Sequence, residues 1–383
     1  MSATSPADLS ALTAVSPVDG RYGDKTAPLR AHFSEYGLIK QRVLVEVRWL
    51  LALADAGIVP QLPKFDAPSR ALLESIVTDF DVAEAAKVKT IERTTNHDVK
   101  AVEYYLKEAA KAKAAGRADA SQLGERLEFF HFACTSEDIN NLAYSRMLNL
   151  SRSDVLLPVM DKIEAKMTEM AHELADVPML SRTHGQPATP TTAGKEMANV
   201  AVRLRTQLAQ IKAVPMRGKI AGAVGAYQAH AVACPDADWP TFAEGFVKSL
   251  DLEFNAYVTQ IEPHDCIAEL FDAFARFNTV LLDLCRDMWS YISIVRLHAR
   301  MPARRPEGAA RLDGMTLLTP LSPCLSCRAT SSRRSSLARS ALRRCLTRST
   351  RSISRTQRAT SASQTRSSPT SAPSCPSRAG SVT

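Results

Sequence analysis

The stretch that decides the fold is AELFDAFARFNTVLLDLCRDMWS, residues 268–290. Large apolar residues recur in it at alternating spacings of four and three, from Leu270 through Phe277 to Met288. This repeat places them on one face of a long α-helix and is typical of the contact line between helices in a bundle. We therefore predict a long helix over residues 267–291.

Two earlier segments, residues 154–176 and 194–213, carry the same kind of repeat. Together the three segments predict an all-α fold built on a long-helix bundle. Such regular apolar faces indicate core or subunit interface and not a cofactor site. Two further helices are predicted over residues 35–57 and 67–86. The repeating residues of the two earlier segments are Leu156, Met160, Ile163, Met167, Met170 and Leu174, then Met197, Val200, Leu204, Leu208 and Ile211.

The composition changes sharply beyond about Ser293. The chain has 383 residues and a net charge of +8, but from Met301 onward it holds 15 Arg, 18 Ser and 10 Thr, with no Lys and no aromatic residue. That tail carries +13, which leaves −5 for the first 300 residues. It cannot bury enough apolar surface to offset its ordering entropy, so we predict disorder. The predicted domains are an N-terminal helical domain (1–130), an incomplete central long-helix bundle (131–293) and the basic tail (294–383).

Composition also bears on location and metals. No apolar run reaches the length of a membrane span, and the N-terminus lacks a basic region followed by an apolar core. These observations predict a cytoplasmic protein with no membrane partner. The eight scattered cysteines are expected to be reduced. Cys324 and Cys327 lack a second pair at zinc-finger spacing, so no metal site is predicted.

A polar segment, SRTHGQPATP (residues 181–190), separates two of the long helices. Pro187 and Pro190 exclude a helix there, and Gly185 permits a tight turn beside His184. We predict a polar loop that presents one imidazole. An isolated loop histidine is more often simply solvated, so a function for this one depends on which groups meet it.

Two other polar segments have the features of helix starts. Residues 95–98 (TNHD) have capping-box spacing, with Asn96 and His97 at the mouth of the predicted helix. Thr135 and Ser136 are candidate caps of another helix, with acidic residues in its first turn. The free N–H groups of such starts suit anions, although simple capping is the alternative interpretation.

Three more segments complete the survey. Residues 16–25 (SPVDGRYGDK) form turns, and Arg21 there is either an anion partner or an ordinary surface arginine. Residues 218–227 (GKIAGAVGAY) do not fit a nucleotide-binding glycine loop, so a close backbone approach or a flexible turn is favoured. Residues 107–126 are rich in Ala and Lys and are expected to form a surface connection.

Several of these segments, in this order, resemble the bacterial type of adenylosuccinate lyase. The likeness covers roughly residues 10–293, about three quarters of the chain. Fumarase, aspartase and argininosuccinate lyase share the superfamily fold but resemble these segments less. The matching segments are SPVDGRYGDK, ERTTNHDVKAVEYYLKE, HFACTSEDINN, LSRTHGQPATP, GKEMANVA and TQIEPHD.

The resemblance implies a fold of the fumarase/aspartase type and β-elimination of fumarate. The substrates would be adenylosuccinate, giving AMP, and succinylaminoimidazole carboxamide ribotide. It also implies no cofactor and a homotetramer whose sites combine three subunits, with His184 as the general acid. The residues matching positions that contact the nucleotide and succinyl portions are Arg21, Tyr22, Asn96, His97, Asp98, Thr135, Ser136 and Gln260.

The sequence departs from this family after the third long helix. There the family has a mobile loop of the type GSSTMPHKVNP, which supplies a serine general base and a lysine, and then further bundle helices. This chain instead continues with IVRLHAR, residues 294–300, and a tail that looks like translation in a shifted frame. We therefore expect little or no lyase activity from the chain as written.

Two alternatives stay open. One is another fumarate-releasing lyase of the superfamily, such as argininosuccinate lyase. The other is a non-catalytic helical protein whose basic tail binds nucleic acid through its phosphates. The second is disfavoured because the tail lacks aromatic residues for base stacking.

Overall fold

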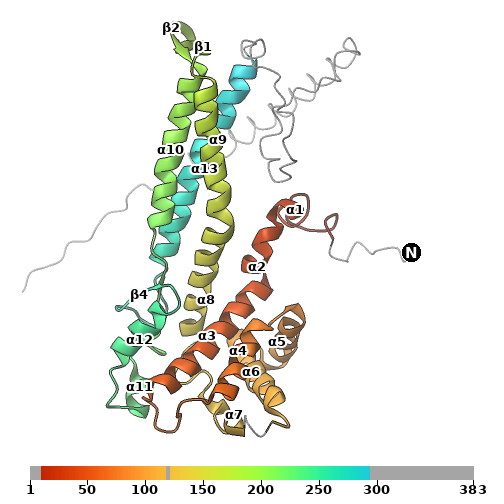
Figure 1. Ribbon diagram of the computed structural model, residues 1–383, viewed down its shortest axis with the longest axis vertical. Helices are drawn as coiled ribbons and strands as arrows, with labels where there is room; N and C mark the ends of the chain where they lie inside the picture. The colour runs from red at the N-terminus through yellow and green to blue at the C-terminus, as the bar shows by residue number, and fades with distance from the viewer. Residues whose placement is uncertain (1–9, 118–120, 294–383) are drawn as a thin grey trace, which may run out of the picture. The chain divides into compact units, whose positions relative to one another are not determined.

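The computed structural model describes residues 10–117 and 121–293, all of which belong to one structural unit (Figure 1). The described part is helical apart from four short strands, so the predicted long-helix fold is confirmed with these strands added. None of its helices combines the length and apolar character needed to cross a bilayer. The tail predicted to be disordered, residues 294–383, lies outside the described residues.

The first elements lead into one long buried helix. They are α1 (Gly23–Thr26), the 3₁₀ turn η1 (Ala27–Leu29) and α2 (Arg30–Phe33), followed by α3 (Glu35–Ala56). The position of α3 confirms the helix predicted over residues 35–57.

Helix α3 is the centre of the first half of the unit. It packs against α4 (Ala67–Thr78), α5 (Val82–Thr95), α6 (Asp98–Ala114) and α8 (Ser136–Ser151). Because neighbours lie on several of its sides, most of its apolar side chains are excluded from solvent. The buried ones include Val43, Val47, Trp49, Leu50 and Leu53.

The single helix predicted over residues 67–86 is wrong, because two helices meet there. Helix α5 starts after Asp81, whose side chain accepts a hydrogen bond from the backbone N–H of Glu84. Between the two helices Phe80 is buried and stacks on Tyr36, with ring centroids 6.1 Å apart. The apolar pattern of residues 67–86 looked like that of one helix. The buried Phe80 ring and the Asp81 cap interrupt the helix between Thr78 and Val82.

The surface connection predicted over residues 107–126 is wrong in its first part. Helix α6 continues to Ala114, since Ala and Lys are good helix formers. Helix α7 (Ser121–Glu125) and the turn η3 (Leu127–Phe129) then lead to α8.

The three predicted long helices are present. Helix α8 continues through a π-helical turn, η4 (Arg152–Leu156), into α9 (Leu157–Glu173), and α10 (Ala193–Ala213) and α13 (Asp265–Ser293) follow. Pro158 accounts for the π turn, because proline has no N–H to donate and its ring displaces the carbonyl one turn earlier.

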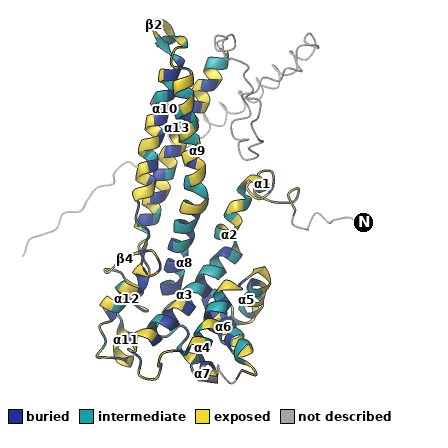
Figure 2. Ribbon diagram, viewed as in Figure 1, coloured by how far each residue is buried: buried dark blue, intermediate teal, exposed yellow. Residues whose placement is uncertain are grey.

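Helix α10 packs against both α9 and α13, and Figure 2 shows buried stripes along these helices beside exposed ones. The predicted apolar repeats supply the buried stripes, as expected for helix–helix packing. Their buried members are Met160 and Met167 on α9, Met197, Val200, Leu204, Leu208 and Ile211 on α10, and Leu270, Phe277, Leu284 and Met288 on α13.

The polar loop predicted around His184 is a β-hairpin. Strand β1 (Pro178–Thr183) pairs antiparallel with β2 (Gln186–Thr192). Both strands are edges, where prolines are tolerated. His184 and Gly185 form the two-residue turn, with φ of 53° and 76°, as in the tight turns favoured by hairpins.

The segment between α10 and α13 completes the unit. It contains α11 (Gln228–Ala233), α12 (Trp239–Lys248) and the short parallel pair β3 (Arg217–Gly218) and β4 (Glu253–Phe254). The cysteines of the described part are all free thiols, as predicted: Cys134, Cys234, Cys266 and Cys285.

Candidate active site

The starts of α6 and α8 meet through two of the predicted site residues. His97 caps α6, and its Nδ1 accepts a hydrogen bond from the backbone N–H of Lys100 at 3.1 Å. In the neutral ring the proton is therefore on Nε2, which lies 3.3 Å from Ser136 Oγ. The capping role expected for Thr95 is wrong, since its hydroxyl bonds the backbone of His97 instead, and Asn96 ends α5 in the left-handed conformation.

The start of α8 is a capping box, in which one of the two candidate caps, Thr135, is the N-cap. Asp138 Oδ2 accepts the backbone N–H of Thr135 at 2.8 Å. Ser136 follows as the first helical residue, with its hydroxyl toward His97. Free N–H groups, two hydroxyls and an imidazole thus gather at one place, which suits an anionic group.

Asp138 also joins α8 to the glycine-rich segment. Its Oδ1 accepts from Lys219 Nζ at 2.7 Å and from the backbone N–H of Ala221 at 2.9 Å, and its Oδ2 accepts from Gly222 N–H at 3.1 Å. Both ionic side chains are completely buried. Of the two expectations for this segment, the close backbone approach is confirmed at Gly225, where an added Cβ would lie 2.5 Å from the backbone oxygens of Val258 and Thr259.

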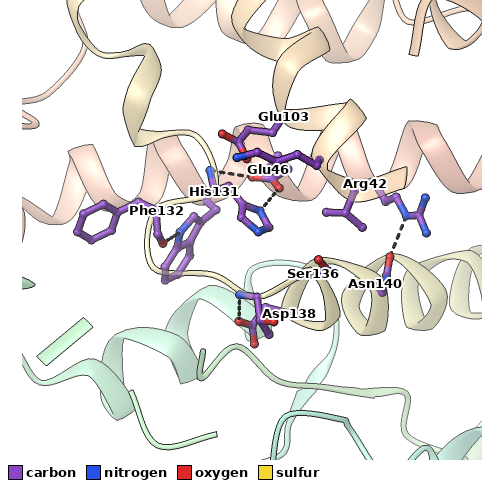
Figure 3. Close-up of polar contacts among 12 residues, drawn as sticks. Arg42, Glu46, Glu103, His131, Phe132, Ser136, Asp138 and Asn140 are labelled. Carbon is purple, nitrogen blue, oxygen red and sulfur yellow. Dashed lines mark hydrogen bonds and ion pairs between the residues drawn. The ribbon is translucent and has the colours of Figure 1, made fainter. Parts of the chain in front are cut away.

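Arg42 of α3 links both helix starts, and Figure 3 shows its hydrogen bond to Asn140 of α8. Its Nη2 lies 2.6 Å from Asp98 Oδ2, and its Nε donates to Asn140 Oδ1 at 2.9 Å. Partial burial raises the pKa of the Asp98 carboxyl, but the Arg42 guanidinium and the N–H of Val99 outweigh it. The pKa of Asp98 is therefore below its ordinary value, and Asp98 is held ionised.

A further charged pair, Glu46 and His131, lies next to Arg42 (Figure 3). His131 Nδ1 is 2.6 Å from Glu46 Oε1, and its backbone N–H donates to Glu46 Oε2 at 3.1 Å. Burial lowers the pKa of His131, but the hydrogen bond and charge of Glu46 outweigh it and the pKa lies above its ordinary value. Trp49 Nε1 donates to the carbonyl of Phe132 at 3.0 Å, which holds this segment on α3.

Gln260 is exposed, but the segment that carries it is tied to α8. Buried Glu262 accepts a hydrogen bond from Asn255 Nδ2 at 2.9 Å. The ring of His264 lies between two carboxylates, with Nδ1 3.2 Å from Glu262 and Nε2 3.3 Å from Glu137 in the first turn of α8. Burial raises the pKa of Glu137, an effect that His264 opposes.

The structure does not bring His184 to these groups within one chain. His184 is exposed at the hairpin tip beyond α9, whereas Ser136 begins α8. The continuous helix over residues 136–173 separates them, and at 1.5 Å per residue it is about 55 Å long. Arg21 and Tyr22 are exposed before α1, with the guanidinium carbon 5.8 Å from the ring centroid.

Several charged residues of this site were not predicted from the sequence. Two of them left a signal: Arg42 and Glu46 fall on the apolar face of α3 beside Val43, and a charge at such a position must be paired inside the fold. Lys219 left none, since its partner lies 81 residues away in the chain. The full set is Arg42, Glu46, His131, Asp138, Lys219 and His264.

A protein-family model described as a lyase matches residues 20–304 of this chain. The chain belongs to this lyase family. Adenylosuccinate lyase of Escherichia coli K12 is 55% identical over 287 residues, which are 75% of this chain and 61% of that protein. The corresponding protein of Haemophilus influenzae is 54% identical over 286 residues, again 75% and 61% of the two chains. The chain therefore spans about three fifths of the length of these relatives.

Solved structures show the same architecture. A fumarate lyase from Mesorhizobium superposes with a TM-score of 0.56 at 19% identity, over 70% of this chain and 57% of that one. A β-carboxy-cis,cis-muconate cycloisomerase from Acinetobacter calcoaceticus gives a TM-score of 0.54 at 20% identity, with the same coverage. At this level of identity the likeness concerns the fold alone, and it confirms the predicted long-helix fold.

Proposed function

We propose that this chain carries the substrate-binding and proton-donating parts of an adenylosuccinate lyase. The reaction is β-elimination of fumarate from adenylosuccinate, giving AMP, and from succinylaminoimidazole carboxamide ribotide. The observation that carries the proposal is the meeting of two helix starts at His97 and Ser136, in a chain 55% identical to the Escherichia coli lyase over the matched part.

The proposed binding roles follow from the charges of the substrate, which bears a phosphate and two carboxylates. The hydroxyls of Thr135 and Ser136 and the free N–H groups of the first turn of α8 are donors for one of these anions, with His97 beside them. Arg21 offers a guanidinium to another anion. Tyr22, Asn96, Asp98 and Gln260 complete the proposed contact set.

Elimination needs a base for the Cβ proton, stabilisation of the developing charge and an acid for the leaving nitrogen. We assign the acid to His184. Because about 55 Å of helix separates it from Ser136 in one chain, His184 and the helix starts of one centre must come from different protomers. The proposal therefore requires a homo-oligomer, and we propose that the enzyme with a complete C-terminal part is a tetramer in the cytoplasm. Only the protein's own side chains take part, with no cofactor.

An exposed apolar stripe on α13 supports association between copies. Phe271, Leu282 and Trp289 are 54%, 57% and 78% exposed, which is unusual for such large side chains. They lie on a face separate from the one that packs against α10. The whole stripe repeats at spacings of four and three and comprises Phe271, Ala275, Asn278, Leu282, Cys285 and Trp289.

Under the proposal, this chain lacks the general base that would take the Cβ proton. Beyond Ser293 the sequence has no counterpart of the serine-bearing loop that the resemblance implies. Loss of one positioned acid or base costs about 10²–10⁴ in rate. We therefore expect the chain as written to turn over little or no adenylosuccinate and, with its apolar stripes uncovered, to associate without forming a defined tetramer.

A chimera tests the function. Residues 1–293 would be joined to the corresponding C-terminal part of the Escherichia coli adenylosuccinate lyase, and loss of adenylosuccinate followed spectroscopically. We expect turnover by the chimera and almost none by the chain as written. A folded chimera that acts on argininosuccinate and not on adenylosuccinate would contradict the proposed substrate. Ordinary turnover by the chain as written would contradict the missing base.

A further inference from the structure

We propose that Lys219 is a positioning residue, which acts through Asp138 to hold the start of α8 in the orientation that substrate requires. The inference rests on the proposed function, because it concerns the helix start that carries Thr135 and Ser136. Lys219 does not touch the substrate itself, since its side chain is completely buried.

The contacts of Lys219 with α8 involve both its side chain and its backbone. Its Nζ binds Asp138 Oδ1 at 2.7 Å. Its backbone N–H donates to Asn141 Oδ1 at 2.8 Å, and its carbonyl accepts from Asn141 Nδ2 at 3.1 Å. One residue is thus attached at three points to the first turns of the helix.

The Asp138 carboxylate receives four donors in all, counting Thr135, Ala221 and Gly222 with Lys219. Charge-assisted hydrogen bonds are directional, and a carboxylate with four of them has a single orientation. A buried ion pair of this kind adds little net stability compared with apolar side chains of the same volume. Its distinctive contribution is therefore geometric: it sets the depth and rotation of the first turn of α8.

Rotation of this turn matters because Ser136 lies two residues before Asp138. A small rotation of the helix changes the distance from Ser136 Oγ to His97 Nε2, which is 3.3 Å and near the long limit of a hydrogen bond. The start of α6 is fixed separately by Arg42. Lys219 therefore acts on α8 alone, whereas Arg42 holds the start of α6 and also binds Asn140 of α8.

The same glycine-rich segment also reaches the part of the chain that precedes Gln260. A Cβ at Gly225 would lie 2.5 Å from the carbonyl oxygens of both Val258 and Thr259, so the two backbones are in direct contact. A shift of the segment that begins at Lys219 would move both proposed substrate contacts, Ser136 and Gln260, together.

The test compares Lys219→Met with Lys212→Met in the full chain. Lys212 is a matched control, because it also pairs with an aspartate at 2.9 Å, Asp161, but both side chains are about half exposed. The readouts are the ¹H–¹³C resonance of His97 Cε1, assigned by its loss in His97→Gln, and the Kd for AMP. Circular dichroism confirms folding.

We expect Lys219→Met to shift the His97 resonance and to weaken AMP binding by about tenfold to a hundredfold, as misplacement of binding groups does. Lys212→Met should leave both readouts within about twofold of the parent, as for an exposed pair. A folded Lys219→Met chain with the resonance of the parent would overturn the proposal. If the parent binds no AMP, the His97 resonance alone decides the positioning role, and turnover by the chimera decides the proposed function separately.

A second variant covers loss of folding by Lys219→Met, which leaves a buried carboxylate without its cation. Asp138→Asn combined with Lys219→Met removes both charges and is expected to fold. It should shift the His97 resonance as the single variant does. A double variant with the parent resonance would overturn the proposal, and so would one that fails to fold, since the pair would then be required for folding itself.

Discussion

At the scale of single residues, His230 shows how burial alone alters chemistry. It is 1% exposed, and neither ring nitrogen has a hydrogen-bond partner among the described residues. The rings of Trp49, Tyr227 and Trp239 surround it, with the nearest centroid, that of Trp239, at 4.8 Å. Burial lowers the pKa of His230 to about 4.

This depressed pKa predicts acid sensitivity. Between pH 6.5 and about 4 the unfolded chain binds a proton at His230 that the folded chain does not. The stability is thus complete above pH 6.5 and falls by about 3 kcal/mol as the pH drops to about 4. His230→Phe should remove this part of the pH dependence. The measurement is the free energy of unfolding in urea at several pH values across this range. The same dependence on pH in the parent and in His230→Phe would refute the prediction.

The role of His184 is tested in the chimera. His184→Ala should lower kcat by about 10²–10⁴, because the leaving nitrogen would lose its proton donor. His172→Ala is the control, since His172 is an exposed histidine on α9 and should leave kcat within about threefold of the parent. Turnover of His184→Ala within that same range would remove His184 from the proposed role.

At the scale of elements, the segment between α10 and α11 fixes the position of the start of α8. The segment that follows α10 returns its backbone to α8 through Lys219 and to residues 258–259 through Gly225. Gly225 has a φ of +76°, a conformation that glycine adopts without strain. These contacts hold three sequence-distant segments together beside the helix starts.

Two glycines give a matched test of this close approach. Gly225→Ala would place a methyl group 2.5 Å from two carbonyl oxygens at positive φ, so we expect a loss of more than about 1 kcal/mol in stability. Gly245→Ala, within the exposed face of α12, meets no atom within 4 Å and should gain about 0.5–1 kcal/mol. Urea unfolding of both variants compares them. If Gly225→Ala leaves the free energy of unfolding unchanged, the backbone at Gly225 can move away from residues 258–259 at no cost, and the close approach is not required.

At the scale of the whole molecule, α13 presents one face to α10 and another to solvent. Beside the buried apolar face that packs against α10, the half-exposed Asp283–Arg203 pair also joins the two helices, with Asp283 Oδ2 3.1 Å from the guanidinium. The apolar stripe of Leu282 and Trp289 has no such cover within the described chain. Association of copies through this stripe would bury it.

Assembly of the chimera should therefore depend on the stripe. Leu282→Glu places a charge where a large apolar side chain would be buried, and we expect it to reduce the tetramer to smaller species. Thr279→Glu is the control, because Thr279 is exposed on the same helix outside the stripe. Size-exclusion chromatography with light scattering measures both. A tetramer in Leu282→Glu would place the interface elsewhere.

The amino-acid sequence was sufficient to locate α3, α9, α10 and α13, because apolar periodicity is a local property of each helix. It also offered Thr135 as a candidate cap of α8, and Thr135 is the N-cap, with its partner Asp138 three residues away. The general character of the fold follows from these helices. The roles of the nine predicted site residues stay predictions.

Tertiary structure decided what depends on distant partners. The break at Phe80 arises because its ring fills a site against Tyr36, and the segment around His184 becomes a hairpin through pairing between two strands. Lys219 is ionic and fully buried only because Asp138, 81 residues away, receives it. Burial, dielectric and hydrogen-bond partners are properties of a position in space, and residues far apart in the chain acquire them only when the helices pack.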